Sequence, residues 1–283
     1  MYYSPRFSPD GRRLAISIDS GKGMDISIHD FERDTTSPVT FSAATNTDAV
    51  WTPDGTHFVF RSRGSRTWDL WWMRADGAGG PQPLGSGEIE DLSANALSPK
   101  GDRLIYTQVD PVTGPDLWVM PIDVRDPDRP KAGLAQPILK TPASEIRPAF
   151  SHDGRWVAYA SNESGIMQVY VRTFEQPASG SDGKWQISSA GGATPIWSRN
   201  GRELFYLSQN RIMVSDFVVR GRSFMAGRSR VWSNQQLLTT GFTNLDLAPD
   251  GKRFAAVPAP STLAETRVTV LLNFFEELRR RLP

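Results

Sequence analysis

Short alternations of apolar and polar residues recur along the whole chain, and each pair of alternations is joined by a four-residue turn that ends in glycine. Six copies of the turn are present: Ser8–Gly11, Thr52–Gly55, Ser98–Gly101, Ser151–Gly154, Ser198–Gly201 and Ala248–Gly251. Successive turn glycines lie 44, 46, 53, 47 and 50 residues apart. This spacing indicates an internal repeat, and such a repeat predicts the architecture more directly than any single motif.

Each position of the turn has a physical reason. Proline presets φ for the first central turn position, and Asp or Asn hydrogen-bonds to its own backbone. Glycine accepts the left-handed conformation that closes a hairpin. His152 and Arg199 replace the proline in two copies, whereas the glycine is never replaced. Positive φ is therefore the stricter requirement, and we expect it at all six glycines.

The residues flanking the turns predict strands. An apolar residue stands four positions before every turn glycine and another three positions after it, as Trp51 and Phe58 do around Gly55. Apolar positions then continue with the period of two that is typical of a strand. A third strand is predicted in every repeat, for example at Asp25–His29, and an outer strand in five of them, for example at Val39–Phe41.

Four antiparallel strands in each of six repeats predict an all-β fold, namely a six-bladed β-propeller. A single four-stranded sheet cannot cover both of its faces, whereas radially arranged sheets cover one another. We therefore expect one domain over residues 1–283, with blades starting near residues 5, 48, 94, 147, 194 and 243.

The last repeat, Thr243–Leu272, offers only three strands, and Met1–Ser4 are too few to supply a fourth from the other terminus. Residues 273–282 predict a short C-terminal helix, because Phe274, Leu278 and Leu282 recur at helical spacing. Two interpretations remain open. The helix covers the last blade, or the chain is part of a longer protein and leaves a sheet edge open.

The composition of the chain excludes some classes of binding partner. The 32 basic and 31 acidic side chains leave a formal net charge of +1, which argues against a nucleic-acid-binding protein. No apolar run reaches the roughly 18 residues of a membrane-spanning helix, so no membrane insertion is expected. Residues 1–11 do not have the pattern of a signal peptide. Cysteine is absent, so the chain carries no disulfide, and the redox compartment stays open.

The repeats resemble a known family. The turn sequences of Phe7–Gly11, Trp51–Gly55 and Phe150–Gly154 are similar to the TolB-like propeller repeat. The stretches Gly154–Tyr159, Ser161–Gly165, Val169–Arg172, Gly201–Tyr206 and Val270–Leu278 also resemble the C-terminal propellers of bacterial receptor-type Ser/Thr protein kinases and of some winged-helix regulators.

That resemblance implies a propeller that acts as a sensor or protein-binding domain, with an N-terminal kinase or regulator domain that this chain does not contain. It implies a periplasmic or extracytoplasmic position, whereas the chain as it stands suggests the cytoplasm. The sequence has no glycine-rich phosphate loop, no strand lysine in a Val-Ala-Ile-Lys setting and no His-Arg-Asp loop. Kinase activity is therefore not implied for this chain.

Catalytic motifs are missing from the sequence. It has no Gly-x-Ser-x-Gly motif, and its three histidines have neither metal-ligand spacing nor an obvious partner. No catalytic residue, metal ligand or cofactor is assigned on this basis.

Polar residues gather where propeller topology brings loops together. The loops entering the inner strands, and those joining second and third strands, share one face, which we call the top face. The candidate ligand-binding residues there are Asp48, Asp91, Glu145, Arg147, Glu163 and Asn244. Two functions follow from this set. The favoured one is a non-catalytic module that binds a protein, peptide or small polar ligand at the channel mouth. The alternative is a glycosidase-like hydrolase that uses paired carboxylates.

Overall fold

All six turn glycines adopt the left-handed conformation that the sequence predicts, with φ between 67° and 73°. The structure is a computed structural model that describes residues 1–21, 23–41, 44–64, 67–85, 91–174, 183–238, 244–257 and 269–271. Within this part, every hairpin closes with a hydrogen bond from the glycine N–H to the carbonyl three residues earlier, as from Gly55 to Thr52 at 2.8 Å. The turns therefore set the antiparallel pairing of the first two strands in each repeat.

The strands form separate antiparallel sheets, each built from consecutive strands. Two sheets have the predicted four strands in the first part of the chain: β1 (Tyr2–Phe7), β2 (Arg13–Asp19), β3 (Met24–Asp30) and β4 (Thr35–Pro38), and β5 (Thr45–Trp51), β6 (His57–Arg63), β7 (Trp68–Arg74) and β8 (Gln82–Pro83). A later sheet repeats this order with β14 (Glu145–Phe150), β15 (Trp156–Ser161), β16 (Gln168–Thr173) and β17 (Lys184–Gln186).

Two sheets have five strands because a long third strand pairs with two short outer strands. The first consists of β9 (Leu92–Leu97), β10 (Arg103–Asp110), β11 (Gly114–Asp123), β12 (Lys131–Ala132) and β13 (Gln136–Leu139). The second consists of β18 (Ala193–Trp197), β19 (Glu203–Ser208), β20 (Arg211–Arg220), β21 (Ser223–Ala226) and β22 (Arg230–Ser233). The extra strands β12 and β21 were not predicted, because their two or four residues carry no clear alternation.

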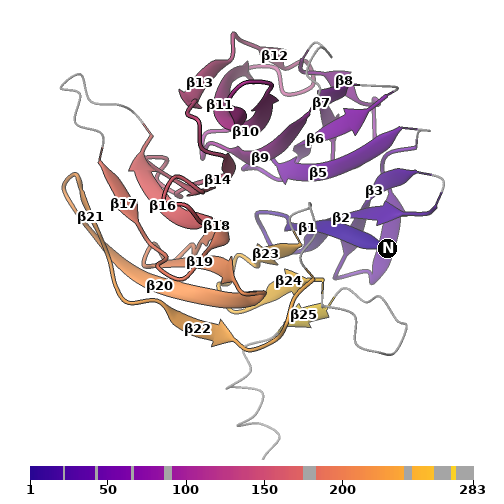
Figure 1. Ribbon diagram of the computed structural model, residues 1–283. Helices are drawn as coiled ribbons and strands as arrows, with labels where there is room; N and C mark the ends of the chain where they lie inside the picture. The colour runs from indigo at the N-terminus through magenta and orange to yellow at the C-terminus, as the bar shows by residue number, and fades with distance from the viewer. Residues whose placement is uncertain are drawn as a thin grey trace, which may run out of the picture.

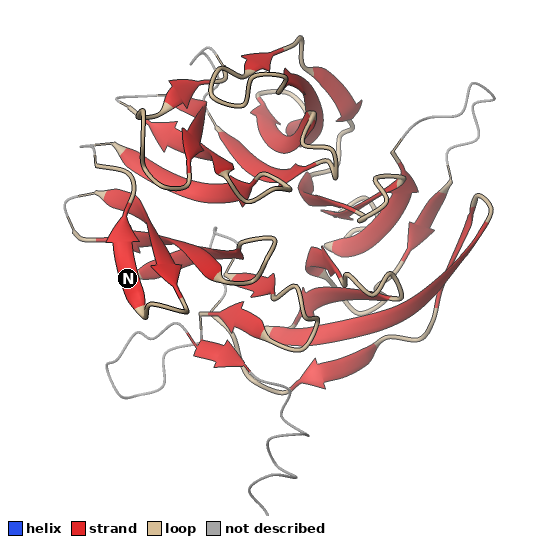
Figure 2. Cartoon of the chain, turned by 180° about the vertical axis from the view of Figure 1, so that it is seen from behind, coloured by secondary structure: helices blue, strands red, loops and turns tan. Residues whose placement is uncertain are grey.

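The last repeat differs from the expectation of six four-stranded blades. Its described residues form only β23 (Leu245–Leu247), β24 (Phe254–Ala256) and β25 (Thr269–Leu271), paired in that order. The structure thus has five complete blades, not six, and a three-stranded sheet in the remaining place. The predicted helix over 273–282 lies outside the described residues, and the described residues consist of strands and loops (Figure 2).

The sheets surround a common centre, with β1, β5, β9, β14, β18 and β23 innermost (Figure 1). The innermost strand of the first sheet begins at Tyr2, earlier than expected, because Tyr2 and Tyr3 already pair with Ile18 and Ser17 of β2. The outer strand of that sheet ends at Pro38, so Val39 follows it instead of belonging to it, and the Val39 side chain is buried between blades.

The hydrophobic core lies between neighbouring sheets. Trp72 of β7 and Tyr106 of β10 belong to one buried cluster, and Phe7 of β1 shares another with Ala248 and Ala255 of the last repeat. This second cluster joins the first and last sheets, as does a 2.7 Å hydrogen bond from the Phe7 N–H to the carboxylate of Asp246. Within the described residues, the first and last sheets are therefore joined by side-chain packing and by this bond, and no strand of β1–β4 pairs with β23–β25.

Candidate functional site

Four of the innermost strands share an unusual backbone conformation. Ser4, Asp48, Arg147 and Thr194 each stand seven residues before their turn glycine, and all four have φ between 47° and 57°. The strand register shifts at these residues, which marks a β-bulge in β1, β5, β14 and β18. A non-glycine residue in this region costs on the order of 1 kcal/mol, and bulges of this kind redirect a side chain. The bulges thus determine the direction of the side chains nearest the axis.

Side chains at this repeat position contact each other between adjacent blades. The Ser4 hydroxyl donates to Asp48 Oδ1 at 2.6 Å, and Arg147 Nη1 donates to Thr194 Oγ1 at 2.6 Å. Two of the predicted residues, Asp48 and Arg147, therefore belong to an ordered polar layer around the axis, and Asn244 occupies the same repeat position.

Asp48 and Asp91 are joined by an arginine that the sequence analysis did not select. Arg61 Nε lies 2.8 Å from Asp48 Oδ2, and its Nη1 lies 3.3 Å from Asp91 Oδ1. The side chains of Arg61 and Asp48 are only 9% and 10% exposed, whereas that of Asp91 is 55% exposed. The Arg61 guanidinium also lies 4.1 Å above the Trp68 ring. These two predicted carboxylates thus neutralise a buried cation.

Charged residues of other blades act on Arg147. Burial lowers its pKa, the carboxylate of Asp48 raises it, and the charge of Arg6 lowers it again. The three charges are therefore close enough to interact across the channel.

Glu145 is buried instead of standing at an open mouth. It is 1% exposed, and it accepts a 2.5 Å hydrogen bond from the Thr141 hydroxyl through Oε1. Burial raises the pKa of Glu145, and the nearby charges of Asp116 and Glu163 raise it further. Its Oε2 and Asp116 Oδ1 are both buried, and neither has a hydrogen-bond partner within the described residues.

The last two predicted residues, Glu163 and Asn244, each contact a residue near them. Glu163 forms a 2.7 Å ion pair with Lys184 of β17, and both side chains are partly exposed. Asn244 is 3% exposed, and its Nδ2 lies 3.4 Å from the Leu238 carbonyl. Whether these six residues form one binding site stays a prediction.

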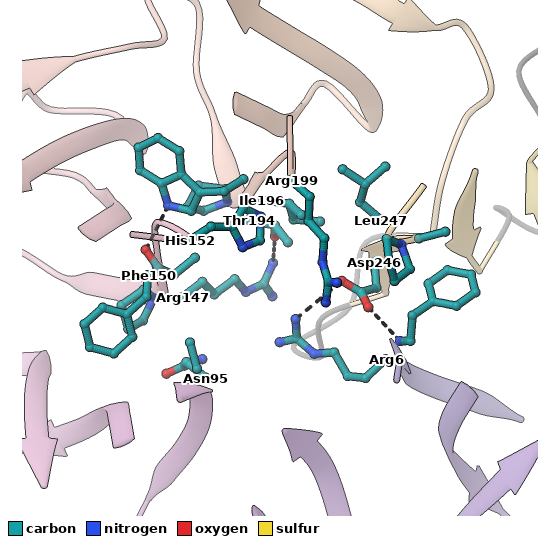
Figure 3. A pocket seen from close by; sticks show the side chains of 18 of the residues that line it. Arg6, Asn95, Arg147, Phe150, His152, Thr194, Ile196, Arg199, Asp246 and Leu247 are labelled. Atoms are coloured by element: carbon teal, nitrogen blue, oxygen red, sulfur yellow. Dashed lines mark hydrogen bonds and ion pairs between the residues drawn. The ribbon is translucent and has the colours of Figure 1, made fainter. Parts of the chain in front are cut away.

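A cavity of about 200 Å³ lies on the axis, toward the face that carries the turns. It is lined by residues from several innermost strands and adjoining turns (Figure 3). Its polar and charged lining comprises Arg6, Ser8, Asn95, Arg147, His152, Thr194, Arg199 and Asp246, and its apolar lining includes Ala96, Ala149, Ile196 and Leu247. Among the predicted residues, only Arg147 lines this cavity.

The Arg6 and Asp246 pair bridges the first and last sheets at this cavity. Their nearest charged atoms, Arg6 Nη1 and Asp246 Oδ1, are 3.9 Å apart, which is too long for a hydrogen bond. Burial raises the pKa of Asp246, and the charge of Arg6 opposes that effect. The charge of Arg199 acts on Asp246 in the same direction as that of Arg6. One carboxylate thus lies within the field of two arginines.

The turns explain why the cavity is open on this face. In three successive turns the proline packs on the next turn's glycine: a Cβ on Gly55, Gly101 or Gly154 would lie 3.2–3.3 Å from Cδ of Pro9, Pro53 or Pro99. His152 and Arg199 occupy the equivalent proline positions of the fourth and fifth turns. Gly201 closes the turn that follows the one containing His152, and a Cβ on Gly201 would meet nothing within 4 Å. His152 and Arg199 therefore interrupt the proline ring where the cavity lies.

Most residues of this cavity were not predicted, although the repeat carries two signals of them. Arg6 and Asp246 stand five residues before their turn glycines, where the other four repeats have Val50, Ala96, Ala149 and Ile196. Ala96, Ala149 and Ile196 at this repeat position also line the cavity, so a charge at the same position is a signal of a polar group facing it. The two missing prolines are the second signal, and both mark residues that line the cavity.

Other kinds of site receive no support from the described residues. No group of three or more His, Asp or Glu side chains in this part of the chain could hold a metal ion. The described residues also contain no helix that is long and apolar enough to cross a membrane.

Comparison with solved structures supports the fold. No protein-family model matches the chain. TolB from Acinetobacter baumannii is 20% identical with a TM-score of 0.61, over 83% of this chain and 55% of that one. A putative TolB from Agrobacterium tumefaciens is 19% identical with a TM-score of 0.62, over 82% of each chain. The β-propeller domain of Cps50 (Swd1) from Myceliophteria thermophila is 13% identical with a TM-score of 0.57, over 96% of this chain and 86% of that one.

These similarities confirm the TolB-like propeller fold and, at this level of identity, nothing beyond the fold. The chain spans about 55% of the length of the Acinetobacter protein. The resemblance to receptor-kinase propellers stays a prediction.

Proposed function

We propose that this chain is a non-catalytic recognition module that binds a polar ligand in the central channel, with the three-stranded sheet serving as the sixth blade. The observation that carries the proposal is the axial cavity, into which Arg6, Arg147, Arg199 and Asp246 project from four different sheets or their turns. Concave sites with a few convergent polar groups on a rigid scaffold are the usual form of small-ligand sites.

The polar layer above the cavity supports the same function. Four strained bulges and the hydrogen bonds from Ser4 to Asp48 and from Arg147 to Thr194 hold these side chains in place before any ligand arrives. Such preorganisation lowers the entropy cost of binding. The predicted mouth residues then act mainly through Arg147, which belongs to both the layer and the cavity.

The hydrolase alternative has less support. Asp48 and Asp91 are paired with Arg61, Glu163 is paired with Lys184, and Glu145 is buried. A general acid and a nucleophile must both reach the substrate, and in this arrangement the carboxylates already have partners or lie out of reach.

A sensor role would place this module next to an N-terminal kinase or regulator domain. This extension rests on the sequence resemblance alone.

The proposed function is tested by filling the cavity. A library of peptides, sugars and small polar compounds is screened by thermal shift against the wild-type protein and the Ala96→Phe variant. The matched control is Ala226→Phe, because Ala226 is exposed on β21, outside the cavity lining. We expect compounds that stabilise the wild type and Ala226→Phe but not Ala96→Phe. A screen without such compounds, or compounds that stabilise Ala96→Phe equally, would count against a channel site.

A further inference from the structure

We infer that the axial cavity receives a doubly charged anion, presented as carboxylate or phosphate groups, which enters through the interrupted part of the turn ring. This inference rests on the proposed channel site and specifies the chemistry of its ligand.

The charge of the cavity is the first argument. The guanidinium groups of Arg6, Arg147 and Arg199 point toward the same space, and Asp246 is the only carboxylate among the described residues of the lining (Figure 3). Desolvation and the charge of Arg199 lower the pKa of His152, so this imidazole is neutral near pH 7. Three guanidinium groups and one carboxylate leave two positive charges, which a dianion would neutralise. Like charges gathered in a partly desolvated cavity repel one another, and a bound anion relieves that repulsion.

Hydrogen-bond donors are the second argument. An arginine carries five N–H donors in a planar fork that matches the oxygen atoms of carboxylate and phosphate. Arg6 Nε is buried and has no hydrogen-bond partner within the described residues. Its Nη1 lies 3.9 Å from Asp246 Oδ1, and Asp246 Oδ2 accepts from the Phe7 N–H at 2.7 Å instead. Arg6 therefore keeps donors that its own carboxylate does not use.

Arg147 is also oriented to bind the anion. Its Nη1 donates to Thr194 at 2.6 Å, which anchors the guanidinium between β14 and β18. An arginine fixed in this way loses little rotamer entropy when it binds an anion. The anchored Arg147 and the partly unpaired Arg6 thus define two sides of one anion position.

The size of the cavity limits the ligand. About 200 Å³ is below the roughly 300–1,000 Å³ of sites that enclose a drug-sized molecule. The ligand is thus a small dianion, or the charged end of a larger molecule whose remainder stays outside.

The entry route follows from the turns. In three successive turns the proline lies so close to the next turn's glycine that a Cβ added there would lie 3.2–3.3 Å from its Cδ. Where Arg199 replaces it, the exposed side chain lies beside the cavity. A cationic side chain at the entrance attracts an anion and then contributes to holding it.

The inference is tested by isothermal titration calorimetry with inorganic phosphate and with succinate, and with succinamide as the neutral analogue of succinate. The two anions distinguish a phosphate ligand from a carboxylate ligand. The test variant is Arg199→Gln, which removes one charge from an exposed turn residue and leaves the core intact. The control is Arg202→Gln, because Arg202 is exposed, lies three residues further along the same turn and is not part of the cavity lining.

We expect at least one of the two anions to bind and succinamide not to bind. Arg199→Gln should weaken binding by about tenfold or more, as expected for the loss of a charge-assisted hydrogen bond, and Arg202→Gln by less than about twofold. Failure of both anions to bind would overturn the inference. Equal weakening by Arg199→Gln and Arg202→Gln would overturn it too, because it indicates unspecific attraction.

The outcome is separable from that of the proposed function. A neutral compound that stabilises the wild type but not Ala96→Phe, in a protein that binds neither anion, would preserve the channel site and remove its anion specificity. Anion binding that persists unchanged in Ala96→Phe would place the anion outside the channel and contradict both.

Discussion

Replacing Glu145 by glutamine should stabilise this protein at neutral pH. Glu145 is 1% exposed and Asp116 is 0% exposed, and both carboxylates carry a buried oxygen with no hydrogen-bond partner within the described residues. Glutamine keeps the shape of the side chain and an oxygen for the Thr141 hydroxyl, and it adds an N–H donor. We expect this donor to reach Asp116 Oδ1.

The first two blades already contain the arrangement that the substitution would create. There Asn46 Nδ2 donates to Asp25 Oδ1 at 2.9 Å. Asn46 and Glu145 both stand nine residues before their turn glycines, and Asp25 and Asp116 both lie near the start of a third strand. A hydrogen bond to a charged group contributes about 1.5–3 kcal/mol to stability. At about 2–4 °C per kcal/mol, the melting temperature should rise by about 3–12 °C.

The effect should depend on pH in a defined direction. Burial and the charge of Asp116 raise the pKa of Glu145 in the folded state above its ordinary value of 4.5. Below the unfolded pKa the carboxyl is protonated in both states, so its ionisation costs the fold nothing. As the pH rises through 4.5 toward the folded pKa, the unfolded state loses its proton first and the wild type loses stability. The advantage of Glu145→Gln should therefore be small near pH 4 and reach its full size at neutral pH.

The assay is urea denaturation of the wild type and Glu145→Gln between about pH 4 and pH 8. Glu32→Gln is the control, because Glu32 is exposed and its replacement should change the free energy of unfolding by less than about 0.5 kcal/mol. A Glu145→Gln variant that is no more stable than the wild type at pH 7 would refute the reasoning. So would a gain of the same size at every pH, because it would not come from ionisation of Glu145.

Three further substitutions test the turns and the axis. Gly55→Val should cost about 1–3 kcal/mol, because φ is +69° and a Cβ there would lie 3.3 Å from Pro9 Cδ; an unchanged melting temperature would contradict this. Arg61→Met should cost about 3–5 kcal/mol in urea denaturation, because it leaves the largely buried Asp48 carboxylate without its cation, and a cost below about 1 kcal/mol would show that the pair is dispensable. Arg199→Pro should raise stability by about 0.4–1 kcal/mol, because it restores the proline of the other turns, and should abolish ligand binding in the channel; loss of stability would show that this turn has a different geometry.

The repeat was predictable because its signals are local. A turn glycine with positive φ, a period of two on either side and a proline before it depend on neighbouring residues, so they can be read in one dimension. The left-handed conformation of Gly11 and its five counterparts confirms the predicted turns. The sheets confirm the propeller fold, with five complete blades instead of the six predicted. The extra strands β12 and β21 were not predictable in the same way, because strands of two and four residues form only where the long β11 and β20 offer an edge.

The candidate site was predictable only in part. Repeat positions place Asp48, Arg147 and Asn244 at equivalent points, and in the structure the charge of Asp48 acts on Arg147. Local sequence does not show that Glu145 is buried against Asp116, because that depends on how β11 packs beside β14. The same holds for Arg61, whose partners Asp48 and Asp91 come from two different blades.

The sequence by itself therefore determined the repeat, its turns and the class of fold, since these follow from backbone preferences and from the periodic burial of apolar side chains. Only the tertiary structure decided which charges meet at the axis. Arg6 and Asp246 are 240 residues apart in the chain, yet they form an ion pair because the first and last sheets close the ring. Electrostatic interactions depend on distance in space and on exclusion of water, and both are set by the closed arrangement of sheets.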